Sequence, residues 1–226
     1  MQYKEKRRHG LSQKMRNSLL SALALLSTLN FPVHAEDGML LRSSAKVISQ
    51  PDLKGPLGSE WSTGKGRWEP GSGLLKVTDL PEEHHIPVLH LATGPVPLVW
   101  ECQFRFNSGK AFLVGCDGQK HVGRVVIGPK VFKICEDSTE VKGKSPSHTL
   151  TEAAVGLQSG DWHTLRVESR GEQMAARLDG VELLAEHAYL GSQKVRWWFA
   201  AGDSVEIRNV RVSEGEPLQA KAAPAP

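Results

Sequence analysis

The sequence lacks the short motifs that mark several enzyme classes. It contains no G-x-G-x-x-G or G-x-x-x-x-G-K-[ST] run, so the usual phosphate-binding loops are absent. It contains no G-x-S-x-G run, which is the main sequence signal of a serine hydrolase. No histidine pair follows the H-E-x-x-H spacing of zinc proteases. We therefore expect no cofactor and no bound metal ion.

Apolar runs long enough to cross a bilayer are also missing. The run Ser18–Phe31 is short of the roughly 20 residues that a membrane-spanning helix needs. Lys and Arg residues precede it, and Val33-His34-Ala35 offers a small-x-small cleavage site after it. This order is typical of a secretory signal peptide. We predict a signal peptide over residues 1–35 and export to the periplasm or the medium, with an uncleaved membrane anchor as the alternative.

An excess of positive charge is missing once this leader is set aside. The whole chain has 28 Lys and Arg against 25 Asp and Glu, of which six basic and one acidic lie in residues 1–35, leaving 22 against 24. A net charge of about −2 without a basic patch does not indicate nucleic-acid binding. The Ala- and Pro-rich residues 214–226 favour a disordered tail. We therefore predict one folded domain over residues 38–213.

Short segments of alternating apolar and polar residues fill this domain. In the clearest, Pro97–Gly109, every second residue from Trp100 to Phe106 is apolar and the residues between are polar. Other candidate strands cover residues 73–79, 86–92, 111–117, 123–128, 130–135, 194–202 and 205–212. Many short strands separated by Gly and Pro turns predict an all-β sandwich or barrel.

The turn at residues 107–109 predicts a hairpin between the strands on either side of it. Pairing Phe106 with Phe112 places Cys102 opposite Cys116. Export permits a disulfide between these two cysteines, and buried free thiols fit the same positions. Since the chain has 3 cysteines, at least one is unpaired.

Residues 160–184 pose a choice between a helix and strands. Their Glu-, Ala- and Leu-rich second half favours a helix by propensity. Arg170-Gly171-Glu172 and Asp179-Gly180 are turn signals, however, and Asp-Gly favours a type I′ hairpin. Pairing Leu178 with Val181 then places the apolar residues of both strands on one face. We predict three strands.

This segment, together with the strand at 205–212, resembles the C-terminal half of the 3-keto-disaccharide hydrolase family. The matching positions are turn and core residues: Gly160, Trp162, His163, Asp179-Gly180-Val181 and Ile207-Arg208-Asn209-Val210. Residues 61–74 and 104–115 resemble two further motifs of the family, whereas residues 121–144 have no confident equivalent. The resemblance implies a secreted domain with a concanavalin A-like jelly-roll sandwich that acts on glycans.

In the fold that the resemblance implies, the concave sheet face forms the glycan cleft. We expect the polar face of 98–106 to line it, with Glu101 as a catalytic carboxylate and Gln103 and Arg105 as substrate-binding groups. Asp117, at the end of the next strand, is the candidate for a second carboxylate. Two carboxylates about 5–10 Å apart are the arrangement of glycosidases. A solvated sheet face with salt bridges is the alternative.

Trp197 and Trp198 are adjacent and therefore face opposite sides of a strand. We expect Trp197 in the core and Trp198, with Arg196, on the polar face, where an indole ring can stack on a sugar. Packing of Trp198 under a loop is the alternative. Three further tryptophans, Trp61, Trp68 and Trp162, are predicted core anchors.

Two clusters of polar residues fit no standard metal site. His84, His85 and His90 follow no zinc spacing, and we expect a loop that leads into a strand. Residues 135–140 contain three carboxylates without the spacing of a calcium loop, and we expect a surface turn.

Three functions remain for a domain of this kind. The first is a secreted enzyme that hydrolyses 3-keto-glycosides, as the family resemblance implies. The second is a non-catalytic carbohydrate-binding module, and the third is a structural or protein-interaction domain of the cell envelope. The first two imply a carbohydrate partner.

Overall fold

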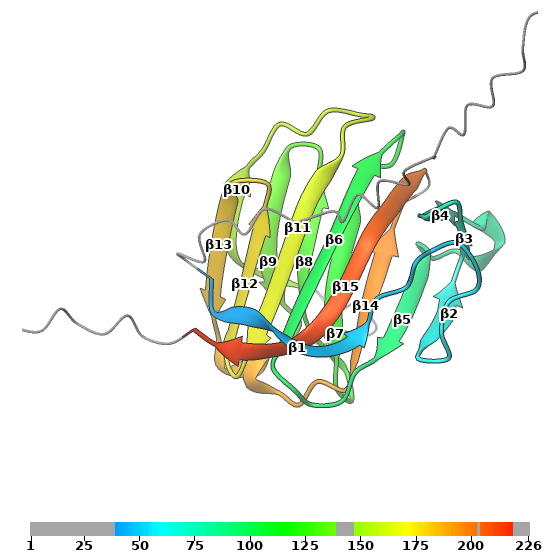
Figure 1. Ribbon diagram of the computed structural model, residues 1–226. Helices are drawn as coiled ribbons and strands as arrows, with labels where there is room; N and C mark the ends of the chain where they lie inside the picture. The colour runs from blue at the N-terminus through cyan, green and yellow to red at the C-terminus, as the bar shows by residue number, and fades with distance from the viewer. Residues whose placement is uncertain (1–38, 139–146, 203, 219–226) are drawn as a thin grey trace, which may run out of the picture. The chain divides into compact units, whose positions relative to one another are not determined.

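Two antiparallel β-sheets lie face to face in the computed structural model, which describes residues 39–138, 147–202 and 204–218. Figure 1 shows the two layers, with one sheet in front of the other. We call the front sheet of this view sheet A and the other sheet B. The all-β sandwich predicted from the sequence is confirmed.

Sheet A contains eight strands, in the spatial order β13 (Val181–Glu186), β12 (Gln173–Leu178), β11 (His163–Arg170), β6 (Leu98–Phe106), β15 (Val205–Pro217), β4 (Leu74–Thr78) and β3 (Arg67–Gly71), with β1 (Leu41–Ser49) also beside β15. Sheet B contains seven strands, in the order β10 (His148–Ala154), β9 (Val131–Glu136), β8 (His121–Gly128), β7 (Phe112–Asp117), β14 (Arg196–Ala201), β5 (Val88–Ala92) and β2 (Trp61–Lys65). Two short 3₁₀ helices, η1 (Pro81–Glu83) and η2 (Ala188–Gly191), lie in the connections.

The core lies between the sheets and consists of the inward residues of the alternating strands. Trp100 of β6 meets Phe199 of β14 edge to face, with ring centroids 4.5 Å apart. Phe104 of β6 and Phe112 of β7 lie 4.7 Å apart. Aromatic contacts of this kind add to the burial of apolar area, which is the main stabilising contribution of the sandwich. Trp61, Trp68 and Trp197 belong to the same core, as predicted.

Residues 163–186 form three strands rather than a helix, and the predicted register is confirmed. Leu178 pairs with Val181, Ala176 with Leu183, and Met174 with Ala185. Asp179 has a φ of 52°, whereas Gly180 lies outside the left-handed region, so the turn departs from the type I′ geometry that the sequence predicts.

The predicted hairpin between residues 98–106 and 112–117 is wrong. β6 pairs with β11 and β15 in sheet A, while β7 pairs with β8 and β14 in sheet B. The intervening residues therefore cross from one sheet to the other, and both apolar faces meet across the core. Cys102 and Cys116 consequently lie on different sheets, and these two cysteines and Cys135 are all buried free thiols.

The ends of the domain differ partly from the sequence prediction. β15 continues to Pro217, beyond the boundary predicted at Ser213. The predicted signal peptide, and the rest of the predicted tail from residue 219 onward, lie outside the described residues. No helix in the described ranges has the length and apolar character needed to cross a membrane.

Candidate functional site

The two carboxylates predicted to act together lie on opposite outer faces of the sandwich. Glu101 is on the outer face of sheet A, because its neighbours Trp100 and Cys102 face the core. Asp117 is on the outer face of sheet B, because Cys116 faces the core. The core therefore separates them, and the predicted catalytic pair is not formed.

Glu101 belongs to a closed network on sheet A. It accepts hydrogen bonds from Arg166 Nη1 at 2.9 Å and from Ser43 Oγ at 3.0 Å. Arg166 also donates to Glu168 Oε1 at 2.6 Å and to the carbonyl oxygen of Leu41 at 2.7 Å. The beginning of β1 crosses the sheet here (Figure 1), so Glu168 is 0 % exposed. This network joins β1 to the sheet and engages both carboxylate oxygens of Glu101.

Gln103 and Arg105, the other polar residues of β6, also have partners within sheet A. Gln103 Oε1 accepts hydrogen bonds from Arg208 Nε and Asn209 Nδ2, both at 2.9 Å. Arg105 Nε donates to Glu206 Oε2 at 2.6 Å. The guanidinium carbons of Arg105 and Arg208 lie 4.8 and 3.9 Å from the ring centroid of Trp162.

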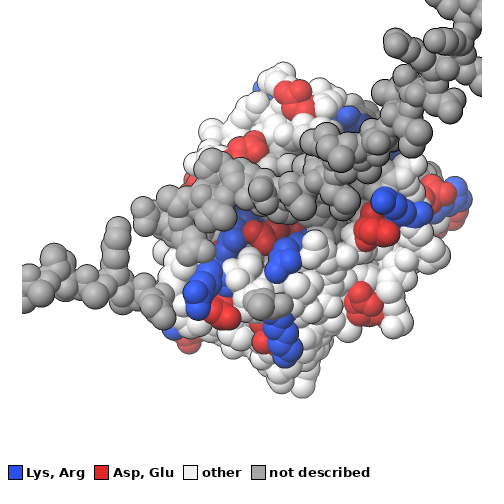
Figure 2. Space-filling model, in the orientation of Figure 1, with Lys and Arg blue, Asp and Glu red and all other residues white. Residues whose placement is uncertain are grey.

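Trp162 is therefore half-buried between two arginines and is not the core anchor that the sequence predicts. Figure 2 views the molecule from the side of sheet A, and acidic and basic side chains lie next to one another there. The solvated face with salt bridges, the alternative for this strand, describes it better than a binding cleft.

The outer face of sheet B is organised differently, in rows that run across its strands. A central row contains Ser62, His90, Trp198, Gly115 and Arg124. A polar row beside it contains Arg196, Asp117 and His121. An apolar row on the other side contains Val88, Ala200, Leu113 and Val126. The outer face of sheet B thus carries three parallel rows: the polar row, the central row with the rings of His90 and Trp198, and the apolar row.

Glycine residues provide the space for the aromatic side chains of the central row. A Cβ atom on Gly115 would lie 2.1 Å from Cζ2 of Trp198, so the indole ring lies directly over this glycine. A Cβ atom on Gly64 would lie 2.4 Å from Cε1 of His90. Both rings therefore lie against the backbone of these glycines, and any longer side chain there would displace them.

Asp117 holds three groups of this face in position. Its Oδ1 accepts hydrogen bonds from Trp198 Nε1 and His121 Nδ1, each at 2.7 Å. Its Oδ2 accepts from Arg196 Nη2 at 2.6 Å and from Arg196 Nε at 3.2 Å. The side chain of Asp117 is only 3 % exposed, whereas those of His121 and Arg196 are 51 % and 47 % exposed. A buried carboxylate thus orients two groups that reach solvent.

The ionisation of this cluster follows from these contacts. Burial raises the pKa of Asp117, but hydrogen bonds from His121, Arg196 and Trp198 outweigh burial and hold that pKa below its ordinary value. The hydrogen bond to Asp117 raises the pKa of His121. Burial and the nearby charge of Arg196 lower the pKa of His90. Asp117 is therefore ionised and His90 neutral at pH 7.

Trp198 and Arg196 lie on the polar face, as predicted, but the indole ring is not an open platform. Trp198 is only 4 % exposed. The His121 ring lies 5.8 Å from it, and the guanidinium carbon of Arg124 lies 5.9 Å from its centroid. The groups that a ligand would meet first are therefore the side chains around the indole.

The sequence prediction of the site does not include His90, His121 or Arg124 of this face, nor the buried Asp137 behind Arg124. Arg124 donates to Asp137 Oδ1 at 2.5 Å and to Oδ2 at 3.0 Å. Cys135 and Glu136 end β9, and they and Asp137 are buried, so the surface turn predicted for residues 135–140 is wrong at these positions, while residues 139 and 140 lie outside the described residues. His90 was placed only in a histidine cluster. The alternation of both strands, with Leu89, Leu91 and Val125 inward, is the signal that places His90 and Arg124 on the outer face.

A groove of about 370 Å³ lies over this cluster. It is lined by residues from five strands and the connection before β5: Gly64, Lys65, His85, Ile86, Val88, His90, Leu113, Asp117, His121, Arg124, Arg196, Trp198 and Ala200. Asp117 is the single carboxylate among them. Within residues 39–138, 147–202 and 204–218, no group of three or more His, Cys, Asp or Glu is arranged to hold a metal ion.

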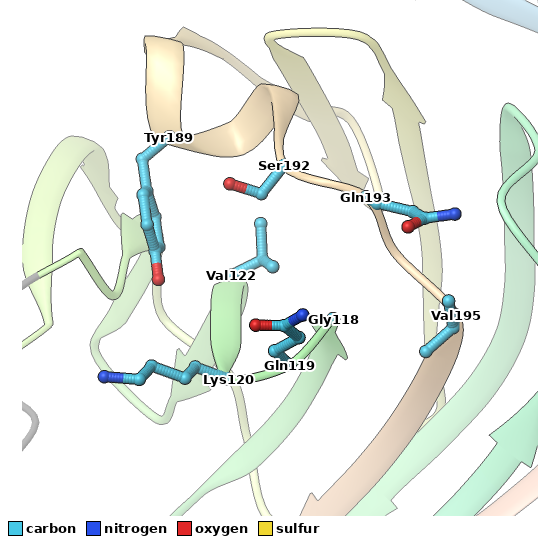
Figure 3. A pocket seen from close by; sticks show the side chains of 8 residues that line it. All are labelled: Gly118, Gln119, Lys120, Val122, Tyr189, Ser192, Gln193 and Val195. Atoms are coloured by element: carbon cyan, nitrogen blue, oxygen red, sulfur yellow. The ribbon is translucent and has the colours of Figure 1, made fainter.

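A second hollow, also of about 370 Å³, continues from the same residues along the chain. In Figure 3, Tyr189, Ser192 and Gln193 lie on one side of the hollow, and the β7–β8 turn, which carries Gly118 and Gln119, lies on the other. A Cβ atom on Gly118 would lie 2.2 Å from the carbonyl oxygen of Gln193, so the two segments approach closely. Asp117 and Gly118 are adjacent, and so are Val195 and Arg196, so residues that line the hollow are chain neighbours of residues that line the groove, although the two have no lining residue in common.

Comparisons with known proteins identify the fold but no family. No protein-family model matches the chain, and no curated protein matches it. A Bacillus subtilis protein of unknown function with a galectin-like fold has a TM-score of 0.58 at 8 % identity, covering 79 % of this chain and 100 % of that one. Porphyranase B from Zobellia galactanivorans has a TM-score of 0.55 at 12 % identity, covering 76 % and 92 %.

A third solved structure, a carbohydrate-binding module from Bacillus subtilis, has a TM-score of 0.52 at 12 % identity and covers 69 % of this chain and 96 % of that one. Identities this low establish the fold alone, because one fold hosts many functions. The jelly-roll sandwich of the concanavalin A and galectin type is therefore confirmed. The 3-keto-disaccharide hydrolase family remains a resemblance.

Proposed function

We propose that the protein is a carbohydrate-binding domain whose ligand lies in the groove on the outer face of sheet B. One observation carries the proposal. Asp117 fixes the orientation of His121, Arg196 and Trp198, so polar groups point into the groove before any ligand arrives. Groups held in this way lose little conformational entropy on binding, which favours affinity.

The three rows of the groove suit a sugar ring. Such a ring has apolar C–H faces and a rim of hydroxyl groups. Val88, which is half-buried, provides apolar contact above the buried Leu113 and Ala200, while His90, Arg124 and Arg196 supply hydrogen-bonding groups. Binding sites for small ligands usually combine mostly apolar walls with a few oriented polar groups.

Cleavage of the ligand has less support. Glycoside hydrolysis by the usual route needs two carboxyl groups, one of which donates a proton to the leaving oxygen. Asp117 has a lowered pKa and accepts hydrogen bonds on both oxygens, so it is a poor proton donor. Glu101 lies on the other face of the sandwich. We therefore place binding ahead of the 3-keto-glycoside hydrolysis that the family resemblance implies.

Two further considerations support the proposal. Porphyranase B and the carbohydrate-binding module from Bacillus subtilis have the same fold, and both names refer to carbohydrate. The sequence also predicts export, and an exported domain meets the polysaccharides of cell walls and of the surroundings. Cell fractionation with an antibody against the protein tests export, and recovery of the protein in the cytosol would contradict it.

Binding is tested by exposing the purified protein to an array of neutral and acidic glycans and titrating the ligands it selects by calorimetry. We expect Asp117→Ala to weaken binding by about tenfold or more, because three groups of the groove lose their charged anchor. Glu101→Ala is the matched control on the opposite face, and its affinity should equal that of the unmodified protein.

Two results would contradict the proposal. A blank array with folded protein removes carbohydrate binding. The second result is release of free sugar from 3-keto-glucosides or ordinary disaccharides, detected by chromatography. If Asp117→Ala abolishes this release, catalysis is assigned to the groove.

A further inference from the structure

The groove carries more positive than negative charge. Lys65 of β2, Arg124 of β8 and Arg196 of β14 line it, against Asp117 as its only carboxylate among the described residues. His121 lines it as well and adds positive charge when protonated. Cationic groups from three strands therefore converge on a single concave surface.

The carboxylates in and behind the groove neutralise this charge only in part, because Asp117 and Asp137 face three cationic side chains. Asp117 is 3 % exposed and has both oxygens engaged, so it offsets the charge of Arg196 but offers no free oxygen to a ligand. Asp137 is buried behind Arg124 and is bound to the guanidinium by two hydrogen bonds. Lys65 has no carboxylate partner among the described residues. The two buried acids thus hold the arginines in place while the outer surface of the groove stays positive.

Both arginines keep hydrogen-bonding capacity for a ligand. A guanidinium has five N–H donors. Arg196 uses Nε and Nη2 on Asp117, and Arg124 uses the same two nitrogens on Asp137. Within the part of the chain that the structure describes, Nη1 of each arginine has no protein acceptor. Planar guanidinium groups match the paired oxygens of carboxylates and sulfate esters.

Arg166 of sheet A shows what a saturated arginine looks like in the same fold. Its Nε, Nη1 and Nη2 each donate to a protein acceptor: Glu168, Glu101 and the carbonyl oxygen of Leu41. Such an arginine stabilises the fold and has no nitrogen left for a ligand. The arginines of sheet B are each anchored through one side of the guanidinium only, which leaves the other side for recognition.

We propose that the saccharide bound in this groove is anionic, and that Nη1 of Arg124 and of Arg196 recognise its carboxylate or sulfate group. This inference rests on the proposed function and specifies the class of sugar. Lys65 adds attraction without a defined contact. The neutral part of the sugar lies against the apolar row of Val88, Leu113 and Ala200.

The test compares pairs of oligosaccharides that differ only in charge. Oligogalacturonate is titrated against its methyl ester, and a sulfated agar oligosaccharide against its desulfated form, with affinity measured by calorimetry. We expect the charged member of at least one pair to bind about tenfold more tightly, a difference of about 1.4 kcal/mol. Which pair responds tells a uronate ligand from a sulfated one.

Variants of the two arginines identify the recognising groups. Arg124→Gln and Arg196→Gln should each reduce the preference for the charged sugar, whereas Arg170→Gln, at an exposed arginine of sheet A, should leave it unchanged. Each variant also removes the partner of a buried carboxylate, Asp137 or Asp117, and can therefore disturb the local structure. For this reason the unmodified protein is also titrated between 50 and 500 mM NaCl. Affinity for the charged sugar should fall with salt, because counterions screen the groove, while affinity for the neutral one should not.

Each outcome decides a different claim. Equal affinity for charged and neutral members overturns the inference and preserves carbohydrate binding. Absence of binding to every sugar overturns both. Competition by inorganic sulfate at the same concentration as the oligosaccharide would show that the groove holds an anion without recognising a sugar, and it would also overturn the inference.

Discussion

The two outer faces of the sandwich contain similar residue types but use them differently. On sheet A, the cationic side chains are paired with carboxylates. Arg166 pairs with Glu101 and Glu168, Arg105 pairs with Glu206, and Lys46 pairs with Glu214. On sheet B, two arginines and a lysine share one groove with a single buried carboxylate. A strand of alternating charged residues therefore does not indicate a site by itself. A site needs polar groups that the fold orients without saturating them.

The faces also differ in what covers them. β1 crosses sheet A and brings main-chain groups to its charges, since Glu168 Oε2 accepts hydrogen bonds from the amides of Leu40 and Leu41 at 2.7 and 2.8 Å. The corresponding region of sheet B is a groove. We therefore expect substitutions on sheet A to change stability and those on sheet B to change binding.

The largest effect on stability is expected at Glu168. Glu168→Ala removes the acceptor of two amides and of Arg166 Nε, all in a buried position, and should lower the free energy of unfolding by about 3 kcal/mol. Urea denaturation measures this. Glu69→Ala, at an exposed position of β3, is the control, and the comparison of the faces fails if Glu168→Ala is equally mild.

The next effect is expected at Gly115, beneath the indole of Trp198. Gly115→Val forces the ring off the sheet and should abolish measurable binding while costing about 1–3 kcal/mol of stability. Gly71→Val is the matched control, because a Cβ atom there meets no atom within 4 Å. Calorimetric titration of both variants checks the prediction, and retained affinity in Gly115→Val would show that the ring is not part of the site.

A smaller effect is expected from pH. The hydrogen bond to Asp117 raises the pKa of His121 above its ordinary 6.5, so the stabilisation by protonated His121 is complete below pH 6.5 and is lost as pH rises through the raised pKa. The pKa of Asp117 lies below its ordinary 3.8, so the stabilisation by ionised Asp117 is present above pH 3.8 and is lost as pH falls.

The charged groups that act on His121 are Asp117, Arg124 and Asp137. Affinity for an anionic sugar should therefore be highest between about pH 4 and 6.5 and weaken at higher pH. Titrations from pH 5 to 9 measure this dependence. His121→Gln should flatten the alkaline part of the profile, and an unchanged profile would assign it to another group.

The smallest effect is expected in the hollow beside the groove. Gln193→Ala should lower the affinity for long oligosaccharides by about threefold, which corresponds to the loss of one ordinary hydrogen bond. The affinity for disaccharides should not change. Comparison of a disaccharide with a hexasaccharide measures this. Equal losses for both lengths would mean that Gln193 acts within the groove itself.

Much of the fold follows from local patterns in the sequence. Alternation in Leu98–Phe106 gives the inward and outward faces of β6 correctly, and the register of Leu178 with Val181 follows from the turn between them. Alternation does not say which sheet a strand joins, however. Two strands that each bury an apolar face can pair side by side or face each other across a core, and β6 and β7 do the latter.

The same limit explains the outcome for the site. Alternation places Arg196 and Trp198 on a polar face correctly, and the sequence singles out Asp117 as a candidate carboxylate. Its partners depend on pairing between β7 and β14, which are about 80 residues apart in the chain, as the Trp198–Asp117 hydrogen bond shows with a separation of 81. A single sequence gives no register for such distant strands, so Glu101 was chosen in place of Arg124 and His90.

The position of β15 has a consequence for the order of events in the cell. This last strand of the described chain lies between β6 and both β1 and β4, and Leu41 near one end of the domain pairs with Pro217 near the other. Sheet A therefore cannot close until the ribosome has delivered residues 205–217. For the export proposed above, this order would keep sheet A incomplete, and the domain incompletely folded, until residue 217 has been made.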